Sequence, residues 1–294
     1  MLLAVPNVSE GRDSRRVSRI EAAFATGAAL LDTHRDAVHN RSVITLAGDP
    51  GTLAQALLNG ARATIEEIDM RRHQGAHPCI GALDVCPVVW VRPADADPAR
   101  EEAREVARGI ALELGVPVFL YGDLASTPRR RERGFFREGG MVELHRRMGT
   151  RELRPDRGPA DPHPTAGATL VTARPPLAAF NLELDSGDLS VVRSVAAQLR
   201  ESGGGLPGVR AIGIALNGHR TQVSTNVHDP VAVPLARVVS EVRRLSARHG
   251  ARPVAAEVVG LVPAAALAGY QEDVPLVGFE PAKHVIERRL AGAD

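Results

Sequence analysis

The chain has 294 residues, enough for two modest domains that each bury a hydrophobic core. Apolar residues make up 44% of the sequence and charged residues 24%, as in an ordinary soluble globular protein. The 36 basic and 35 acidic residues leave a formal net charge of +1. This charge balance gives no support for binding to nucleic acid or to an anionic membrane surface.

Cysteine content and the first residues indicate the cellular compartment. Cys79 and Cys86 are the only cysteines, and their spacing is not the Cys-x-x-Cys of a redox or zinc motif, so we expect reduced thiols. The first apolar run has no basic segment before it and stops at Pro6, unlike a signal peptide. No apolar stretch approaches the roughly 18 residues that span a bilayer. We therefore expect a cytoplasmic protein.

Hydrophobic periodicity predicts the same order of elements twice. In the first ninety residues it predicts strands at 2–8, 28–33, 42–47 and 84–91 and helices at 13–25 and 52–70. Further along it predicts strands at 177–184, 209–216, 222–227 and 253–259 and helices at 189–201 and 234–249. Each set has the order βαββαβ of a ferredoxin-like unit. We therefore expect an α+β fold with two ferredoxin-like subdomains.

Additional elements are predicted between the two units. They are a helix at 98–114, a short strand at 117–121 and an arginine-rich stretch at 129–147. Residues 154–167 are rich in turn formers and either form a plain linker or line a cleft between the domains. We place the N-terminal subdomain, with its extra helices and strand, at residues 1–173 and the C-terminal subdomain at 174–294. For residues 264–294 we predict no role beyond packing against the second unit.

A loop with two histidines is the strongest candidate for a catalytic segment. His73 and His77 lie in a stretch broken by Gly75 and Pro78, directly before an apolar strand. Histidine exchanges a proton near neutral pH, and rigid neighbours commonly present such residues on loops. We predict that His77 is catalytic. A metal site is disfavoured because the pair lacks the Glu of the zinc-hydrolase helix and the glycine and proline oppose helical geometry.

Two clusters near the N-terminus are candidate binding segments. Asn7, Ser9 and Glu10 gather where the first strand meets a helix start, which suits a small anionic ligand, although Ser9 could simply cap the helix. Between the next two strands, Asn40 and Arg41 are the candidates for contact with a substrate carboxylate. The other polar residues of that turn need only be solvated.

Polar residues of the second half are weaker candidates. Arg174 follows a strand that the segment beginning at His163 opens. Gln222 and Asn226 lie on a strand of alternating polarity, which is also typical of a half-exposed antiparallel sheet. The glycines at 203–205 are not followed by the Lys-Ser/Thr of a phosphate loop. A dinucleotide fingerprint and a nucleophile elbow are also missing from the sequence.

Seven segments of the chain form a recognisable series. They are Val-Pro-Asn-Val-Ser-Glu-Gly-Arg from Val5, His-Asn-Arg-Ser-Val from His39, His-Pro-x-Ile-Gly-Ala-Leu-Asp-Val-Cys-Pro from His77, Val-Pro-Val-Phe-Leu-Tyr-Gly from Val116, Ala-Phe-Asn-Leu-Glu-Leu from Ala179, Arg-Glu-Ser-Gly-Gly-Gly-Leu-Pro-Gly-Val-Arg-Ala-Ile-Gly from Arg200 and Gln-Val-Ser-Thr-Asn from Gln222. In this order, from the first residues to about Leu267, the chain resembles the glutamate formimidoyltransferase family, the domain that animals fuse to a cyclodeaminase.

The resemblance implies formimino transfer from N-formimino-L-glutamate to N5 of tetrahydrofolate, the co-substrate, with no metal. It places the family's catalytic histidine on His77 and implies a homodimer acting on small molecules, without nucleic acid or membrane partners. It also implies a folate groove between the subdomains. The folate-contacting segment it implies comprises Gly158, Pro159, His163, Pro164, Thr165, Ala166 and Gly167.

The chain departs from the family pattern at several positions. Cys79 stands where the family commonly has an arginine, and His34 stands where animal members have an aspartate that assists the histidine. We keep His34 and Asp36 as candidate assisting residues. Arg157 and Trp90 replace a usual phenylalanine and proline. Loss of the arginine removes a carboxylate partner, so a paralogue with a different donor or acceptor amine, or a folate-binding protein without turnover, stays as an alternative.

Overall fold

The computed structural model describes residues 1–76, 78–216, 220–271 and 273–291. The chain divides into two compact units, Met1–Pro175 and Pro176–Asp294. Both combine helices with a β-sheet, so the predicted α+β class is confirmed. In the described ranges, no helix is long and apolar enough to cross a membrane.

The first unit contains one mixed sheet of seven strands with the order β1-β4-β2-β5-β7-β6, and β3 pairs with β4. The strands are β1 (Leu2–Ala4), β2 (Asn7–Val8), β3 (Ala29–Asp36), β4 (Arg41–Gly48), β5 (Leu83–Val89), β6 (Val118–Leu120) and β7 (Thr169–Arg174). The predicted first strand is divided at Pro6, which cannot donate to the ladder. Both halves pair with β4 and β5, so they occupy one strand position.

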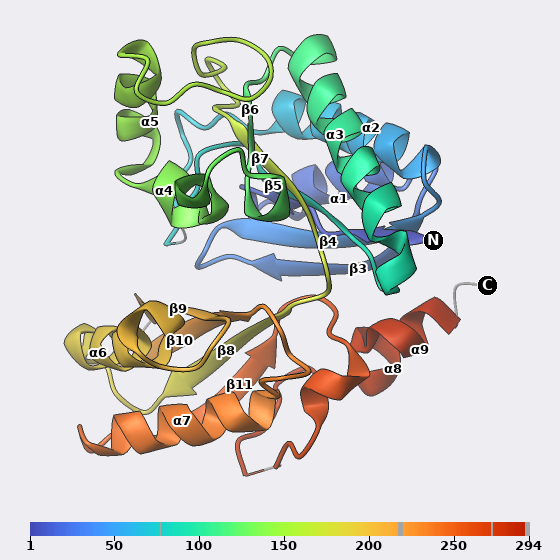
Figure 1. Cartoon of the computed structure of the whole chain (residues 1–294). Coiled ribbons are helices and arrows are strands. Elements are labelled where there is room, and N and C mark those ends of the chain that lie inside the picture. Colours follow the sequence, from blue (N-terminus) through green and yellow to red (C-terminus); the bar gives the residue numbers. More distant parts are fainter. Residues whose placement is uncertain (77, 217–219, 272, 292–294) are drawn as a thin grey trace. The chain divides into compact units, whose positions relative to one another are not determined.

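Helices cover both faces of this sheet (Figure 1). On one face lie α1 (Ser14–Phe24), α2 (Thr52–Glu67) and α3 (Ala96–Glu113), which bury Phe24, Leu57 and Val106 in the larger core. On the other lie α4 (Arg133–Arg137) and α5 (Gly140–Gly149), where Phe136 packs on Phe119 of β6 with ring centroids 5.1 Å apart. Alternate residues of a strand point to opposite faces, which explains why β5, β6 and β7 supply both cores.

The turn-rich segment 154–167 is not a linker between the domains, so that interpretation was wrong. Asp156 N donates to Val118 O and Ala82 N donates to Ala166 O, so the segment returns to the first sheet and enters β7. Gly167 has φ 72°, and a Cβ there would lie 2.2 Å from Ile80 O. Glycine is therefore required for this close approach to the residues that precede β5.

The second unit contains a four-stranded antiparallel sheet with the order β11-β8-β10-β9. The strands are β8 (Ala178–Leu184), β9 (Val209–Ala215), β10 (Thr221–Val227) and β11 (Pro253–Val258). The helices α6 (Leu189–Leu199) and α7 (Leu235–Ala247) follow β8 and β10, and alternate strand residues such as Phe180, Leu182 and Val223 form the core with them. The last residues also belong to this unit, since Ala266 and Val274 pack into its core.

Local signals set several element ends. Asp188 caps α6 by accepting a hydrogen bond from Ser190 N at 2.7 Å. The helix ends at Leu199, two residues before the predicted end, and Gly204 follows in left-handed backbone. Pro234 is the residue before α7 rather than in its first turn. The remaining short elements are η1 (Pro93–Asp95), η2 (Gly122–Leu124), η3 (Pro128–Arg131), η4 (Glu201–Gly203), η5 (Ala264–Leu267), α8 (Pro281–His284) and α9 (Ile286–Ala291).

Candidate active site

Two adjoining pockets of the first unit share three wall residues, Ser9, Asn40 and His73. The larger has a volume of about 300 Å³, within the usual range for small-molecule sites. Its other lining residues are Glu10, Arg16, Ile65, Glu66, Glu67, Ile68, Asp69, Arg72 and Thr165. The smaller, of about 10 Å³, has room for roughly one water. Its other lining residues are Asn7, Val8, His39, Arg41, Cys79 and Asp84.

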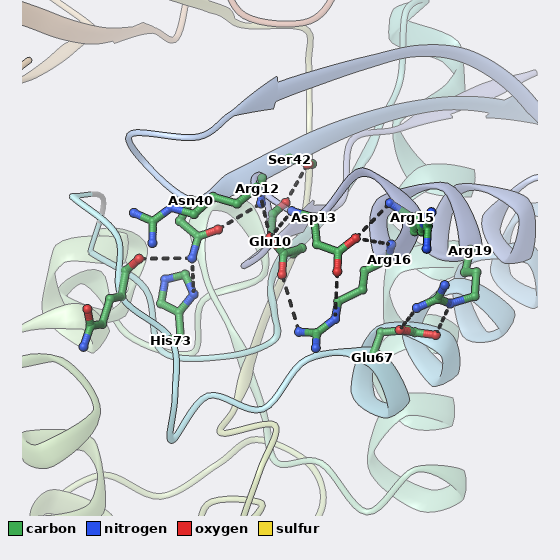
Figure 2. A network of polar contacts seen from close by, with 12 residues as sticks. Glu10, Arg12, Asp13, Arg15, Arg16, Arg19, Asn40, Ser42, Glu67 and His73 are labelled. Atoms are coloured by element: carbon green, nitrogen blue, oxygen red, sulfur yellow. Dashed lines mark hydrogen bonds and ion pairs between the residues drawn. The ribbon is translucent and has the colours of Figure 1, made fainter. Parts of the chain in front are cut away.

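Asn40 holds three segments of the site together. Its Oδ1 accepts from Gly11 N at 3.0 Å, and its Nδ2 donates to Gln74 O at 3.0 Å (Figure 2). The same Nδ2 lies 3.4 Å from Nδ1 of His73. The residue has φ 49°, a left-handed conformation that asparagine tolerates better than most residues. The side chain thus joins the start of β4 to the segment before α1 and to the histidine loop.

The turn before Asn40 is fixed by a carboxylate. Asp36 accepts hydrogen bonds from Val38 N and His39 N, both at 2.9 Å, and its second oxygen binds the His39 ring. Burial raises the pKa of Asp36, but the hydrogen bonds from His39 outweigh that effect and lower the pKa to about 2. His39 is only 1% exposed. Asp36 therefore stabilises the turn between β3 and β4. His34 lies opposite Val43 within the β3–β4 ladder.

Glu10 presents a mostly buried carboxylate to the larger pocket. Its Oε1 accepts from Arg12 N at 2.8 Å and from Asp13 N at 3.0 Å, and its Oε2 lies 3.7 Å from Arg16 (Figure 2). The side chain of Ser9 does not cap α1, so that interpretation was wrong. Asp13 is the cap, accepting from the backbone of the first turn, and Ser9 donates instead to Gly81 O at 2.7 Å.

The histidine loop lies against this junction through close backbone contacts. Met70 N donates to Thr165 O at 2.8 Å, and Ala76 N donates to Val38 O at 3.3 Å. A Cβ on Gly75 would lie 2.2 Å from His39 O, so only glycine permits the approach. Burial lowers the pKa of His73, against the opposing effect of a hydrogen bond with the Ser9 backbone. His73 therefore favours its neutral form at pH 7.

Some predicted residues meet at the two pockets, and others do not. Asn7, Ser9, Glu10, Asn40, Arg41 and Thr165 line one or both pockets. Gly158 approaches Ala111 of α3, where a Cβ would be 3.0 Å from the Ala111 Cβ. Arg174 ends β7. Of the remaining residues of the predicted folate-contacting segment, Pro159 and Pro164 are exposed and Ala166 is buried. The ring of His163 accepts a hydrogen bond from Ala166 N at 3.0 Å. Gly167 is the residue that approaches Ile80 O.

The predicted catalytic residue, His77, lies outside the described residues. Gln222 and Asn226 belong to the second unit, on β10, opposite Glu183 and Ala179 of β8. The register places both on the same side of β10, because residues four apart in a strand share a face.

Sequence analysis missed a buried ion pair beside the smaller pocket. Asp84, at the start of β5, accepts from Ile80 N at 2.8 Å and binds the guanidinium of Arg137 on α4. Both side chains are at most 9% exposed. An Asp directly after an Ile-Gly-Ala-Leu run gives no sign that a residue 53 positions later pairs with it. Within the described ranges, no group of three His, Cys, Asp or Glu side chains is arranged to hold a metal.

Comparison with protein-family models gives two matches that together cover most of the chain. Residues 1–174 match the N-terminal subdomain of the formiminotransferase domain, and residues 179–272 match the formiminotransferase domain. The fold and these matches define a two-unit α+β protein of the formiminotransferase type. The chain belongs to the formiminotransferase family. The predicted family, and with it the prediction that the chain is an enzyme, is confirmed.

Curated relatives agree with this assignment over nearly the whole chain. Glutamate formimidoyltransferase from Streptococcus pyogenes is 36% identical over 98% of this chain and 98% of its own length. The enzyme of the same name from Thermoplasma acidophilum is 35% identical over 98% of this chain and 97% of its own length. Formimidoyltransferase-cyclodeaminase from Sus scrofa is 39% identical over 90% of this chain but only 50% of its own length.

Proposed function

We propose that the chain is a glutamate formimidoyltransferase, which moves the formimino group of N-formimino-L-glutamate to N5 of tetrahydrofolate and releases L-glutamate. The single observation that carries the proposal is the match, end to end, with two curated enzymes of that name. This assigns the chain to folate-dependent one-carbon metabolism. The pockets support the proposal because their walls include Asn7–Glu10 and His39–Arg41, parts of two segments that the sequence resemblance singled out.

The reaction needs one proton to move between two nitrogens. N5 of tetrahydrofolate attacks the amidine carbon, forming a C–N bond and a tetrahedral adduct. The adduct collapses when the bond from that carbon to the glutamate nitrogen breaks, which requires a proton on the departing nitrogen. A neutral imidazole can take the proton from N5 and return it to that nitrogen. We propose that His77 does so, because the ordinary pKa of the histidine side chain type, about 6.5, suits both steps.

Residues close to His77 in the chain support its proposed role as general base and acid. Cys79, two residues after His77 in the chain, lines the smaller pocket, and Ala76 N bonds to Val38 O in the turn before the pocket residue His39. His73 offers a second neutral imidazole on the same loop and serves as the matched comparison. Holding both substrates together would supply much of the remaining acceleration.

Glu10 and Thr165 are proposed to meet the pterin. The pterin ring presents adjacent N–H donors, and a carboxylate can accept two parallel hydrogen bonds. Glu10 Oε2 has no hydrogen bond closer than the 3.7 Å approach of Arg16 in the described part of the chain. A pocket of about 300 Å³ is at the small end of the range for ligand sites and fits a bicyclic ring better than a whole folate.

The rest of the family assignment is kept as part of the proposal. It comprises two ferredoxin-like units, with a folate groove between them that includes Gly158–Gly167, Arg174, Gln222 and Asn226, and a cytoplasmic homodimer that needs no metal. The strand order 4-1-3-2 of the second sheet is that of a ferredoxin-like unit and supports this interpretation.

The proposal is tested by incubating purified protein with N-formimino-L-glutamate and tetrahydrofolate and following 5-formiminotetrahydrofolate. We expect turnover that depends on both substrates. Cys79 stands in place of the family's arginine, which supports a second candidate, a transferase with another amine donor. Turnover with formylglutamate or formiminoglycine, and none with formiminoglutamate, would establish the second candidate and reject the first.

A further inference from the structure

Three arginines lie near the smaller pocket, and in the described part of the chain only Arg137 has a carboxylate, that of Asp84, bonded to its side chain. Arg41 begins β4, and Arg133 and Arg137 lie one turn apart on α4. Burial lowers the pKa of Arg41 to about 10, and the charges of Arg137 and Arg133 act in the same direction. Burial also lowers the pKa of Arg133. Arg41 and Asp84 line the same pocket, Arg137 is bonded to Asp84, and Arg133 lies one helical turn before Arg137. The like charges therefore lie near one another in poorly hydrated surroundings.

Their hydrogen-bonding capacity is largely unused. A guanidinium has five N–H donors. Over the described ranges, Arg133 makes no side-chain hydrogen bond or ion pair, and Arg41 makes none either, although its Nε is fully buried. One terminal nitrogen of Arg137 donates to Asp84, and the Nε of Arg137 is also buried without a partner. Unsatisfied buried donors of this kind cost free energy, and a bound anion would recover it.

Two acidic groups near the cluster, Asp84 and Asp36, are already engaged in hydrogen bonds. Asp84 is bound by Arg137 and by Ile80 N, and Asp36 is bound by His39 and two backbone amides. Both act on the charge of Arg41, but neither carboxylate forms a hydrogen bond or an ion pair with its guanidinium. A ligand carboxylate could therefore accept paired, charge-assisted hydrogen bonds from these arginines.

The cluster lies next to the residues proposed to handle the reaction. Arg41 and Asp84 line the smaller pocket together with Ser9, Asn40 and His73, which also line the larger one. The charges of Arg137 and Arg41 also act on the thiol of Cys79. Positive charge thus reaches the surroundings of residue 79 from β4 and α4, although residue 79 is itself uncharged.

From this arrangement we infer that Arg41, Arg133 and Arg137 form a carboxylate-binding site for the amino-acid part of the formimino donor. The site replaces the arginine that the family commonly has at the position of Cys79, and it makes a glutamate-type donor compatible with this chain. The inference rests on the proposed function. Tetrahydrofolate also carries a glutamate carboxylate, so the experiment must separate the two sources.

The test uses Arg133→Gln, because this side chain contacts no charged partner among the described residues and its loss should leave the fold intact. One charge-assisted hydrogen bond is worth roughly a 10- to 100-fold change in binding. We expect the KM for N-formimino-L-glutamate to rise about 10- to 100-fold, with the KM for tetrahydrofolate unchanged. Arg133→Lys keeps the positive charge but loses the planar guanidinium that binds a carboxylate through two parallel hydrogen bonds. We expect its KM for N-formimino-L-glutamate to lie between those of wild type and Arg133→Gln.

The control is Arg131→Gln, which removes an exposed arginine two residues away on η3, and we expect it to change neither KM. A rise in KM confined to tetrahydrofolate would assign the cluster to the folate and overturn the inference. Equal KM values in wild type and Arg133→Gln would also overturn it.

Calorimetric titration with L-glutamate, the released product, separates this inference from the proposed function. If no donor supports turnover, the proposed function fails, but the carboxylate site is still tested. Binding of L-glutamate that is about 10- to 100-fold weaker in Arg133→Gln than in Arg131→Gln supports the site. Equal binding by the two variants, or no binding by wild type, overturns it.

Discussion

Asn40 connects the fold to the candidate site, and its substitution gives a quantitative test. The Asn40→Ala variant loses the bonds with Gly11 N and Gln74 O, both 3.0 Å long. At about 0.5–1.5 kcal/mol net for each bond, the loss is about 1–3 kcal/mol. Alanine at φ 49° adds about 1 kcal/mol because its Cβ opposes left-handed backbone. We expect destabilisation of about 2–4 kcal/mol for Asn40→Ala and about 1 kcal/mol less for Asn40→Gly.

Urea unfolding followed by tryptophan fluorescence measures this difference. Trp90, the only tryptophan, follows β5, so its signal reports on the first unit. Arg151→Gly is the control for backbone strain alone, because Arg151 has φ 62° and is exposed. We expect that variant to change stability by less than about 1 kcal/mol. Equal losses for Asn40→Ala and Asn40→Gly, or losses below about 0.5 kcal/mol, would refute the reasoning.

Three further predictions concern buried charges and thiols of the first unit. Replacing Asp84 by Asn leaves the Arg137 guanidinium without its carboxylate, and we expect a loss of about 3–5 kcal/mol, seen as a lower Tm by calorimetry. An unchanged Tm would contradict this. Burial raises the pKa of Cys79 to about 11 and of Cys86 to about 12, so both should resist iodoacetamide at pH 8 until the protein unfolds. Rapid labelling of either native thiol would show the reverse. The folded-state pKa of His73 lies below 6.5, so the unfolded chain binds its proton first, and stability should fall as the pH drops below about 6.5. His73→Gln should reduce that slope in urea titrations at several pH values, and identical slopes would count against it.

Sequence patterns predicted the order of the elements well, because alternation and helical periodicity reflect which face is buried. They did not predict that Pro6 divides the first strand, since residues 2–8 form one almost continuously apolar run. They also did not reveal that residues 154–167 return to the first sheet. Turn formers mark where a chain bends but not where it goes, and Gly167 shows its role only beside Ile80.

The candidate site was predicted in part. Asn7, Ser9, Glu10, Asn40 and Arg41 occur in two short polar segments at strand ends, and the structure brings both segments to the same pockets. The arginines of α4 could not be selected from the sequence, because they stand among five other arginines between residues 129 and 147. Their distinguishing features, the bond of Arg137 to Asp84 and the charge effects on Arg41, appear only in the structure.

The most direct test of the central claim is the single-turnover rate of 5-formiminotetrahydrofolate formation by wild type, His77→Asn and His73→Asn. The account predicts a loss of roughly 100- to 10,000-fold for His77→Asn, a much smaller loss for His73→Asn, and unchanged binding of both substrates. Formation at the wild-type rate by His77→Asn would contradict the account.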